Sequence, residues 1–334
     1  MLCRLSFLDG TQKAIYVDSS TTVREAIHTF CEKLGIPFRL RDHFAVNLLR
    51  PDGVLQTLVA TAGYIGDLMR LMEEAGPDTK LCLAQYLFLR RRTPIQESYL
   101  HSLLFVQLRR DVVSGHLPCN EAEALQLASI SIQYEMGDHD QPQSYPLAEH
   151  LAPSWVAAYS AEEWMARLNE AHFAMLGVGK EQCQRKYLHF CQTLKLFGSF
   201  HTDGEIENPA DWKLPAAAVH LAINEDGVEV YSKDGADLYM AHSVTDLARW
   251  RLDNAAGVLE MTIAGRTALV RVKAPMTALL FMLRHLNGYV AALVSQSDYA
   301  HAKADHVVGP EDTDLLAFQK GDVIRVLEHD QGNG

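Results

Sequence analysis

The sequence has no run approaching the roughly 20 apolar residues that a membrane-spanning helix needs. Its opening residues, MLCRLSFLDG (Met1–Gly10), alternate apolar and polar side chains and lack the apolar stretch of a signal peptide. The six cysteines form no CxxC pair and stand inside apolar patterns, which is typical of reduced core thiols. We therefore expect a cytoplasmic protein without a membrane span or a secretory leader.

Basic residues are also few. Lysine and arginine together number 30, against 42 aspartate and glutamate residues, which gives a formal net charge of −12. A surface of that sign repels phosphate backbones, so we expect no nucleic acid partner. With 334 residues, 48% of them hydrophobic, the chain can bury a sizeable core in about two to four globular units.

Motifs for nucleotide binding and nucleophilic catalysis are missing. GVGKEQ (Gly177–Gln182) is similar to part of a phosphate-binding loop, but Ala174 stands where the first glycine belongs and Glu181 replaces the hydroxyl that binds magnesium. A turn between two helices explains these glycines better, because glycine adopts positive φ at little cost. No GxSxG motif occurs. We expect no enzyme activity and no cofactor within this chain.

Two candidate metal motifs have unsuitable spacing. DHD (Asp138–Asp140) and the pair His189 and Cys191 place potential ligands two residues apart, and such residues point in different directions on a helix. A core cysteine beside an exposed histidine explains the second pair better than a ligand pair does. The sequence therefore predicts no metal site.

The first 89 residues have the pattern of a small mixed domain. Two alternating runs flank the turn at Asp9 and Gly10, and a helix follows with Thr22 and Glu25 as its capping box. A second hairpin surrounds RPDG (residues 50–53), and KLCLAQYLFL (residues 80–89) supplies a late strand. The order strand, strand, helix, strand, strand, late strand is that of a ubiquitin-like fold.

From residue 98 to residue 196 the period of the apolar side chains becomes helical. One helix ends at Gly115, a second begins at Asn120, and a third begins at Ser160 with Glu163 completing its capping box. The last helix of this group is QRKYLHFCQTLKL (residues 184–196), which carries four apolar residues on one face.

After residue 200 the period changes to two. Six short strands separated by turn residues are indicated at AAVHLAINE, GVEVYSKDG, DLYMAHSV, ARWRLDN, VLEMTIAG and TALVRVKA. A long helix begins after Pro275. Between the helical part and this β domain stand Leu196, Phe197 and Phe200 around Gly198. So many large apolar groups at a helix end predict a buried junction between packed lobes, not a flexible linker.

This order of lobes resembles the FERM domain. The segment RRDVVSGHLPCNEAEALQLASISIQYEMGDHD (Arg109–Asp140) is similar to the first two helices of a FERM second lobe, and HLAINEDGVEVYSKDG (His220–Gly235) is similar to the early hairpin of a third lobe. The resemblance implies an α+β multi-lobe fold. Its parts are a ubiquitin-like β-grasp lobe at 1–89, a helical lobe like acyl-CoA-binding protein at 95–197, and a PH/PTB-like β-sandwich capped by one helix at 198–298.

Two further segments resemble the tails of unconventional myosins. LAPSWVAAYSAEEWMARLNEAH (Leu151–His172) is more similar to those tails than to ezrin-like proteins, and DLLAFQKGDVIRVLEHDQGNG (Asp314–Gly334) is similar to the front part of a Src-homology-3 domain. We assign residues 300–334 to such a partial Src-homology-3 segment. A FERM domain followed directly by that domain resembles the first tail repeat of class-seven myosins, so we expect the chain to be part of a longer tail.

The resemblance implies a non-catalytic module that binds cargo or adaptor peptides at the cytoskeleton or cell cortex, and that also binds its own motor for autoinhibition. An ATP-hydrolysing motor domain would then lie elsewhere in the full-length protein. Two alternatives stay open: a membrane-docking scaffold that binds phosphoinositides, and the FERM part of another protein, such as a talin-like or kinesin-like linker, a phosphatase or a kinase.

The third lobe is the expected recognition surface. In the family an extended peptide, from a cytoplasmic tail or an adaptor protein, adds to an edge strand and its side chains enter the groove beside the capping helix. The resemblance places that strand at Ala248–Asn254 with Arg249 and Arg251, and the groove wall at Arg284, His285 and Gly288. We expect Arg251 and Arg284 to be exposed.

Two groups of basic residues are candidates for acidic phospholipids. They are Arg90, Arg91 and Arg92, and the pair Arg109 and Arg110. Arginine matches phosphate oxygens with two hydrogen bonds at once, as a lipid site requires. The alternative is that both groups are solvated surface residues paired with nearby carboxylates.

Overall fold

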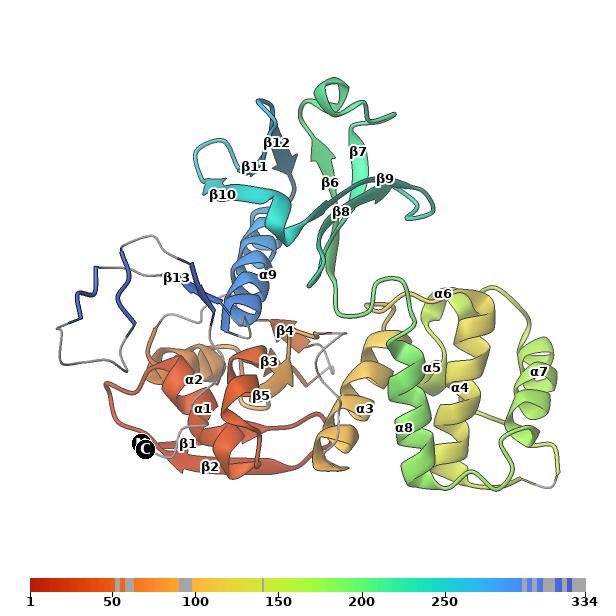
Figure 1. The fold of residues 1–334 in the computed structure, drawn as a ribbon. Helices are drawn as coiled ribbons and strands as arrows, with labels where there is room; N and C mark the ends of the chain where they lie inside the picture. Colours follow the sequence, from red (N-terminus) through yellow and green to blue (C-terminus); the bar gives the residue numbers. More distant parts are fainter. Residues whose placement is uncertain are drawn as a thin grey trace. The chain divides into compact units, whose positions relative to one another are not determined.

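The computed structural model describes residues 1–51, 55–57, 63–89, 98–139, 141–295, 299–301, 305–308, 316–319 and 323–325. The chain divides into two compact units, residues 1–288 and 289–334. We call β1 to β5 the first lobe, α3 to α8 the second lobe, and β6 to α9 the third lobe (Figure 1); α9 begins in the first unit and ends in the second.

The first lobe is built on a five-stranded sheet with the strand order β2-β1-β5-β3-β4. Strands β1 and β5 are parallel, and the other neighbouring strands are antiparallel. This is the ubiquitin-like arrangement that the sequence predicts. Its elements are β1 Leu2–Ser6, β2 Gln12–Tyr16, α1 Val23–Lys33, the 3-10 helix η1 Phe38–His43, β3 Phe44–Leu49, β4 Leu55–Thr57, α2 Ile65–Glu74 and β5 Lys80–Gln85.

Helix α1 begins as its sequence pattern predicts. The Glu25 amide donates to the Thr22 hydroxyl at 3.2 Å, and the Glu25 carboxylate accepts from the Thr22 amide at 2.8 Å. This reciprocal cap satisfies two backbone donors that the helix leaves free. The apolar face of α1, including Val23, Ile27 and Phe30, is buried in the core of the lobe.

The second lobe is a bundle in which α3, α4 and α8 lie side by side (Figure 1). Its elements are α3 Ser98–Val113, α4 Glu121–Met136, α5 Leu147–His150, α6 Pro153–Val156, α7 Ala161–Phe173 and α8 Lys180–Cys191. Capping boxes begin α4 at Asn120 and α7 at Ser160, as the sequence predicts. The short helices α5 and α6 are additional to the sequence prediction.

The third lobe contains a seven-stranded antiparallel sheet with the order β10-β11-β12-β6-β7-β8-β9. Its elements are β6 Phe200–Ile206, η2 Pro209–Trp212, β7 Ala218–Ile223, β8 Gly227–Ser232, β9 Leu238–Ser243, η3 Val244–Asp246, β10 Leu247–Asp253, β11 Val258–Ile263, β12 Leu269–Lys273 and α9 Met276–Ser295. Strand β12 pairs with β6 through only two residue pairs. That narrow connection joins the two halves of the sandwich, and it leaves β10 and β9 as the edge strands.

Helix α9 corrects the expectation that no stretch is long and apolar enough to cross a membrane. Met276–Val294 passes that test, with a mean hydropathy of 1.3 and 39% of the stretch buried. The buried side includes Leu279, Met282 and Leu286, which are at most 1% exposed. A helix that packs such a face into a protein core also reaches this hydropathy, so length and composition alone are weak support for a membrane span.

The second unit, residues 289–334, contains a small antiparallel pair among its described residues. Strand β13 (Tyr299–His301) pairs with β14 (Val323–Arg325), and His306 and Phe318 exchange backbone hydrogen bonds of 2.8 and 3.1 Å. Strand β14 lies within the segment that resembles the front part of a Src-homology-3 domain, and residues 326–334 lie outside the described residues.

Candidate functional site

The segment Tyr86–Leu89, which follows β5, connects the first lobe to the other two. Gln107 of α3 fixes Gln85, the residue just before this segment. The Gln107 side chain accepts from the Gln85 amide at 3.0 Å and donates to the Gln85 carbonyl at 2.7 Å. This pair of hydrogen bonds continues the backbone pairing of β5 through a side chain of another lobe. The segment therefore leaves the sheet with its direction fixed.

Helix α9 contacts the same segment from the third lobe. The Arg284 guanidinium lies 4.3 Å from the centre of the Tyr86 ring, and the His285 ring meets Tyr86 edge to face at 5.5 Å. A Cβ on Gly288 would come within 2.9 Å of the Leu87 side chain. Only a glycine at this point allows the helix to approach so closely.

These contacts correct the expected exposure of the groove wall. Arg284 is 9% exposed and His285 is 7% exposed, so the expectation that Arg284 is exposed is wrong. Arg284, His285 and Gly288 all face Tyr86 and Leu87 of the first lobe. The physical reason is that α9 is apolar on most of its surface, and two of its polar residues, Arg284 and His285, pack against the Tyr86 ring.

The predicted buried junction at the end of the helical lobe is confirmed. Phe197 is 2% exposed and packs edge to face on Phe88 at 5.3 Å. Gly198 has a φ of +69°, and a Cβ there would lie 2.9 Å from the Phe88 Cβ and 3.2 Å from its carbonyl oxygen. Leu196 and Phe200 complete the contact, with Phe200 stacked on His285 at 5.0 Å.

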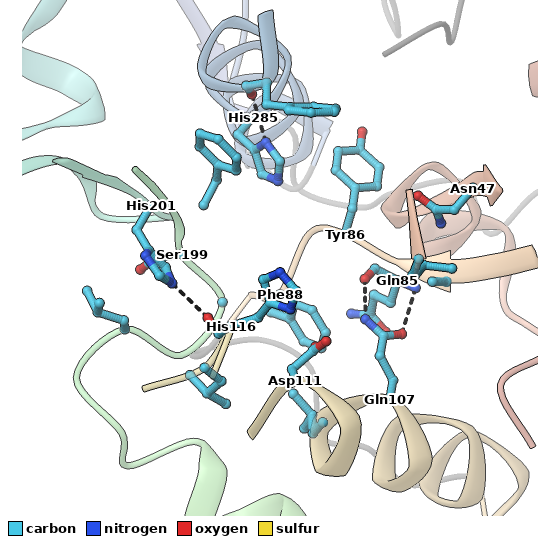
Figure 2. A pocket seen from close by; sticks show the side chains of 18 of the residues that line it. Asn47, Gln85, Tyr86, Phe88, Gln107, Asp111, His116, Ser199, His201 and His285 are labelled. Atoms are coloured by element: carbon cyan, nitrogen blue, oxygen red, sulfur yellow. Dashed lines mark hydrogen bonds between the residues drawn. The ribbon is translucent and has the colours of Figure 1, made fainter. Parts of the chain in front are cut away.

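A cavity of about 660 Å³ opens where the three lobes meet. Figure 2 shows its labelled side chains, with Gln85, Tyr86 and Phe88 in the middle. The second lobe contributes Asp111 and His116, and the third lobe contributes residues of β6 and α9. Its size is within the range of small-molecule sites.

The cavity contains serine, histidine and aspartate without the hydrogen bonds of a catalytic triad. The Ser199 hydroxyl accepts from the Asn224 amide group at 3.3 Å. His201 Nε2 donates to the His116 carbonyl at 2.7 Å. Among the described residues, this nitrogen is therefore bonded to neither Ser199 nor Asp111. Nucleophilic catalysis requires the base within hydrogen-bond reach of the nucleophile, and this arrangement does not provide it.

Asp111 is the most perturbed group in the cavity. Burial raises the pKa of its carboxyl to about 7, and the nearby Arg110 charge opposes that change only in part. Because the folded pKa lies above the ordinary value, ionisation destabilises the folded chain, and stability falls as the pH rises from about 4 through 7.

Asp111→Asn should therefore raise the thermal midpoint at pH 8 and leave it nearly unchanged at pH 4.5, with a gain of at least about 1 kcal/mol at the higher pH. Melting curves at both values test this. Asp237→Asn, at an exposed carboxylate, is the matched control. An equal change at both pH values for Asp111→Asn would show that its carboxyl is not held in the neutral form.

Strand β10 lies at an edge of the sheet, as predicted for the peptide-binding strand. Arg249 and Arg251 are exposed on it. The Arg251 Nε donates to the Glu260 carboxylate at 2.7 Å, and the Trp250 indole donates to Asn287 of α9 at 2.9 Å. Asn287, and not Arg284, is thus the residue of α9 that meets this strand.

The candidate lipid-binding arginines are not gathered into one free surface. Arg109 pairs with Glu135 and donates to the Glu149 carbonyl at 3.1 Å. Arg110 is half-buried beside Asp111. Arg90, Arg91 and Arg92 lie outside the described residues, so their role stays a prediction.

The weak motifs that the sequence raises have structural explanations. Cys191 is buried and His189 is exposed, so the two side chains do not converge. Gly177 and Gly179 lie in the connection that precedes α8, with φ of +80° at Gly177. Sequence reasoning missed Tyr86, Asp111 and Asn287, whose importance depends on contacts between lobes that no local pattern records.

Comparison with known families supports this architecture. Residues 92–201 match the family model of the FERM central domain, and residues 1–89 match that of an RA like domain. Talin-A of Dictyostelium discoideum is 23% identical over 336 residues. That alignment covers 96% of this chain, and the chain spans only about a quarter (24%) of the length of this relative.

Solved structures show the same fold. The FERM and C-terminal domain complex of Drosophila Merlin superposes with a TM-score of 0.69 at 13% identity, covering 89% of this chain and 97% of that chain. The C-terminal MyTH4-FERM domain of human Myosin 7b, solved with the harmonin-a PDZ3 domain, gives 0.65 at 16% identity and covers 88% of this chain and 60% of that one. Residues 92–201 are thus similar to the FERM central domain, and the chain as a whole has a FERM-like fold of ubiquitin-like, helical and PH-like lobes.

Proposed function

We propose that this chain is a protein-interaction module of a cytoskeletal linker that binds an extended peptide along β10. The observation that carries the proposal is that β10 ends the sheet order and presents exposed Arg249 and Arg251 beside α9. An edge strand offers a row of backbone donors and acceptors to an incoming strand. Two arginines on that edge favour an acidic partner.

The relatives suggest the kind of partner. Human Myosin 7b was solved with a PDZ domain of harmonin, and Drosophila Merlin with its own C-terminal domain. By analogy, the partners of this chain are adaptor proteins, cytoplasmic tails or another segment of the same protein, such as a motor domain held inactive. Because the sequence identity to these structures is low, the shared fold supports these partners by analogy.

Five finer assignments belong to the same proposal. The protein acts in the cytoplasm, at the cytoskeleton or cell cortex, and has no activity of its own as an enzyme within this chain. Lobe boundaries lie near residues 89, 95, 197 and 298. Residues 300–334 form the front part of a Src-homology-3 domain. The full-length protein is a class-seven-like myosin, with talin-like and kinesin-like linkers as the alternatives.

The first experiment identifies a partner and its mode of binding. Crosslinking of the purified chain in cell extract should yield peptides attached near β10, and synthetic versions of those peptides should bind. Methylation of alternate backbone nitrogens in such a peptide should abolish binding, because a strand that pairs with β10 needs these donors. Full retention of affinity after methylation would exclude strand addition.

Charge reversal tests the site on the protein. Arg249→Glu should weaken an acidic peptide by about tenfold, because the exposed arginine attracts it and the glutamate repels it. Lys186→Glu makes the same charge change at an exposed position on α8, and calorimetry should show affinity unchanged. Arg249 is preferable to Arg251, whose loss would leave Glu260 with Arg271 as its remaining described ion-pair partner. If Arg249→Glu and Lys186→Glu bound the peptide with equal affinity, the peptide-binding site would not lie at β10.

A further inference from the structure

Three potential metal ligands meet where the end of α4 faces α5. They are Glu135, Glu149 and His150, and one ligand atom from each lies within 4.8 Å of the other two. The two glutamates are exposed and the histidine is 2% exposed. Two carboxylates this close to each other repel, and a cation between them would relieve that repulsion.

The imidazole of His150 presents its Nε2 atom to this cluster. Its Nδ1 pairs with the Ser131 hydroxyl at 3.1 Å, while its Nε2 is buried and has no hydrogen-bond partner among the residues that the structure describes. The nearest acidic atom, Glu135 Oε2, is 3.6 Å away, which is too long for a hydrogen bond.

Arg109 holds both acidic residues in place without occupying the site. Its guanidinium pairs with Glu135 Oε1 and donates to the backbone carbonyl of Glu149 at 3.1 Å. Glu135 Oε2 therefore remains on the side of His150. Ser131 acts similarly on the histidine, because a bond at Nδ1 fixes the ring and directs Nε2 into the cluster.

We propose that His150 Nε2, Glu135 Oε2 and the Glu149 carboxylate bind one divalent transition-metal ion of the zinc class. One nitrogen and two carboxylate oxygens are a ligand set typical of Zn²⁺, with water in the fourth position. Calcium and magnesium prefer oxygen ligands only, and no cysteine is part of the cluster.

The geometry needs only a small contraction. Ligand atoms about 2.1 Å from a tetrahedral zinc ion are ~3.4 Å apart, compared with the upper limit of 4.8 Å here. The exposed Glu149 side chain can turn inward, while Glu135 stays paired with Arg109 and the buried histidine stays in place. The ion would then link the last turn of α4 to α5, which follow each other through the connection between residues 137 and 146.

Metal titration of the whole chain tests this proposal independently of peptide binding. After dialysis against a chelator, the protein is titrated with Zn²⁺ by calorimetry and with Co²⁺ by absorption. We expect one equivalent to bind, with a Co²⁺ spectrum that shows nitrogen and oxygen ligands and no thiolate band. Zn²⁺ should also raise the thermal midpoint, because a ligand that binds only the folded state stabilises it.

Two pairs of variants locate the site. Glu149→Gln, at an exposed position, should weaken Zn²⁺ at least about tenfold, and His150→Asn should abolish stoichiometric binding. Glu170→Gln and His189→Asn, at exposed positions elsewhere in the lobe, should bind as the unaltered chain does. If His150→Asn fails to fold, Glu149→Gln decides the question alone. Absence of stoichiometric binding, unaltered affinity in Glu149→Gln, or a thiolate band in the Co²⁺ spectrum would each overturn the assignment.

Discussion

Gly198→Ala is expected to lower the free energy of unfolding by about 3 kcal/mol. Gly198 has a φ of +69°, which costs a residue with a Cβ about 1–2 kcal/mol. The added methyl would also lie 2.9 Å from the Phe88 Cβ and 3.2 Å from its carbonyl oxygen. Backbone atoms cannot rotate away as the end of a long side chain can, so the second and third lobes must shift on the Tyr86–Leu89 segment.

Gly235→Ala separates the cost of backbone strain from the cost of the contact with Phe88. Gly235 has a φ of +74°, but a Cβ there meets nothing within 4 Å. Denaturant unfolding of both variants should show the smaller loss for Gly235→Ala, equal to the backbone strain alone. The difference measures the contact between Gly198 and Phe88. Equal losses in the two variants would mean that the junction yields to an added methyl group at no cost.

Two histidines beside Tyr86 are expected to contribute stability that is lost as the pH falls from 6.5 to 4, with a sign opposite to that of the Asp111 contribution. The pKa of both His43 and His285 is lowered to about 4, mainly by burial; for His285 the Phe281 carbonyl opposes this change and the Arg284 charge adds to it. A depressed folded pKa means that the stabilisation is complete above the unfolded pKa of about 6.5 and is lost as the pH falls through 4. Each histidine can account for on the order of 3 kcal/mol over that interval.

The His43 and His285 contributions are linked to the contact between lobes. The His43 carbonyl accepts from the Tyr86 amide at 2.9 Å, and the His285 ring stacks on Phe200 and meets Tyr86. Protonation of the His285 ring therefore weakens the packing of the first lobe against its neighbours.

His285→Phe tests the assignment because it keeps an aromatic ring and removes the titrating nitrogen. Its unfolding free energy should fall less steeply between pH 6.5 and pH 4, even if the lost hydrogen bond to the Phe281 carbonyl lowers stability at pH 7.5. The exposed His189→Phe should retain the steep slope. A chelator in all samples removes any contribution of bound metal. An unchanged slope in His285→Phe would assign the acid sensitivity to other groups.

Local patterns predicted most elements correctly because their causes are local. The capping boxes at Thr22, Asn120 and Ser160 satisfy helix donors within four residues, and all three helices begin there. Alternation of apolar residues predicted six strands of the third lobe, and the switch to a period of 3.6 predicted α9. Such signals need no information from distant parts of the chain.

Helix α2 shows why other elements were missed. Its N-cap residue, Tyr64, makes no side-chain cap. The helix is instead started by the first lobe itself, since the Val23 amide donates to the Gly63 carbonyl at 2.9 Å and the Ile65 amide donates to the Thr21 carbonyl at 3.0 Å. These bonds join segments about 40 residues apart, and a local sequence pattern carries no trace of them.

The candidate sites, too, have some features that follow from local sequence and others that depend on distant contacts. The sequence by itself determined the lobes and the buried junction around Gly198, because periodicity, turn residues and clustered apolar groups all have local meaning. The edge position of the strand with Arg249 and Arg251 was implied by the resemblance to FERM domains. Only the tertiary structure decided that Arg284 and His285 lie against Tyr86, and that Glu135 meets Glu149 and His150. A helix that is apolar on nearly every side does not indicate which face will meet which lobe. That choice depends on shape, and here a glycine at position 288 fits against the Leu87 side chain.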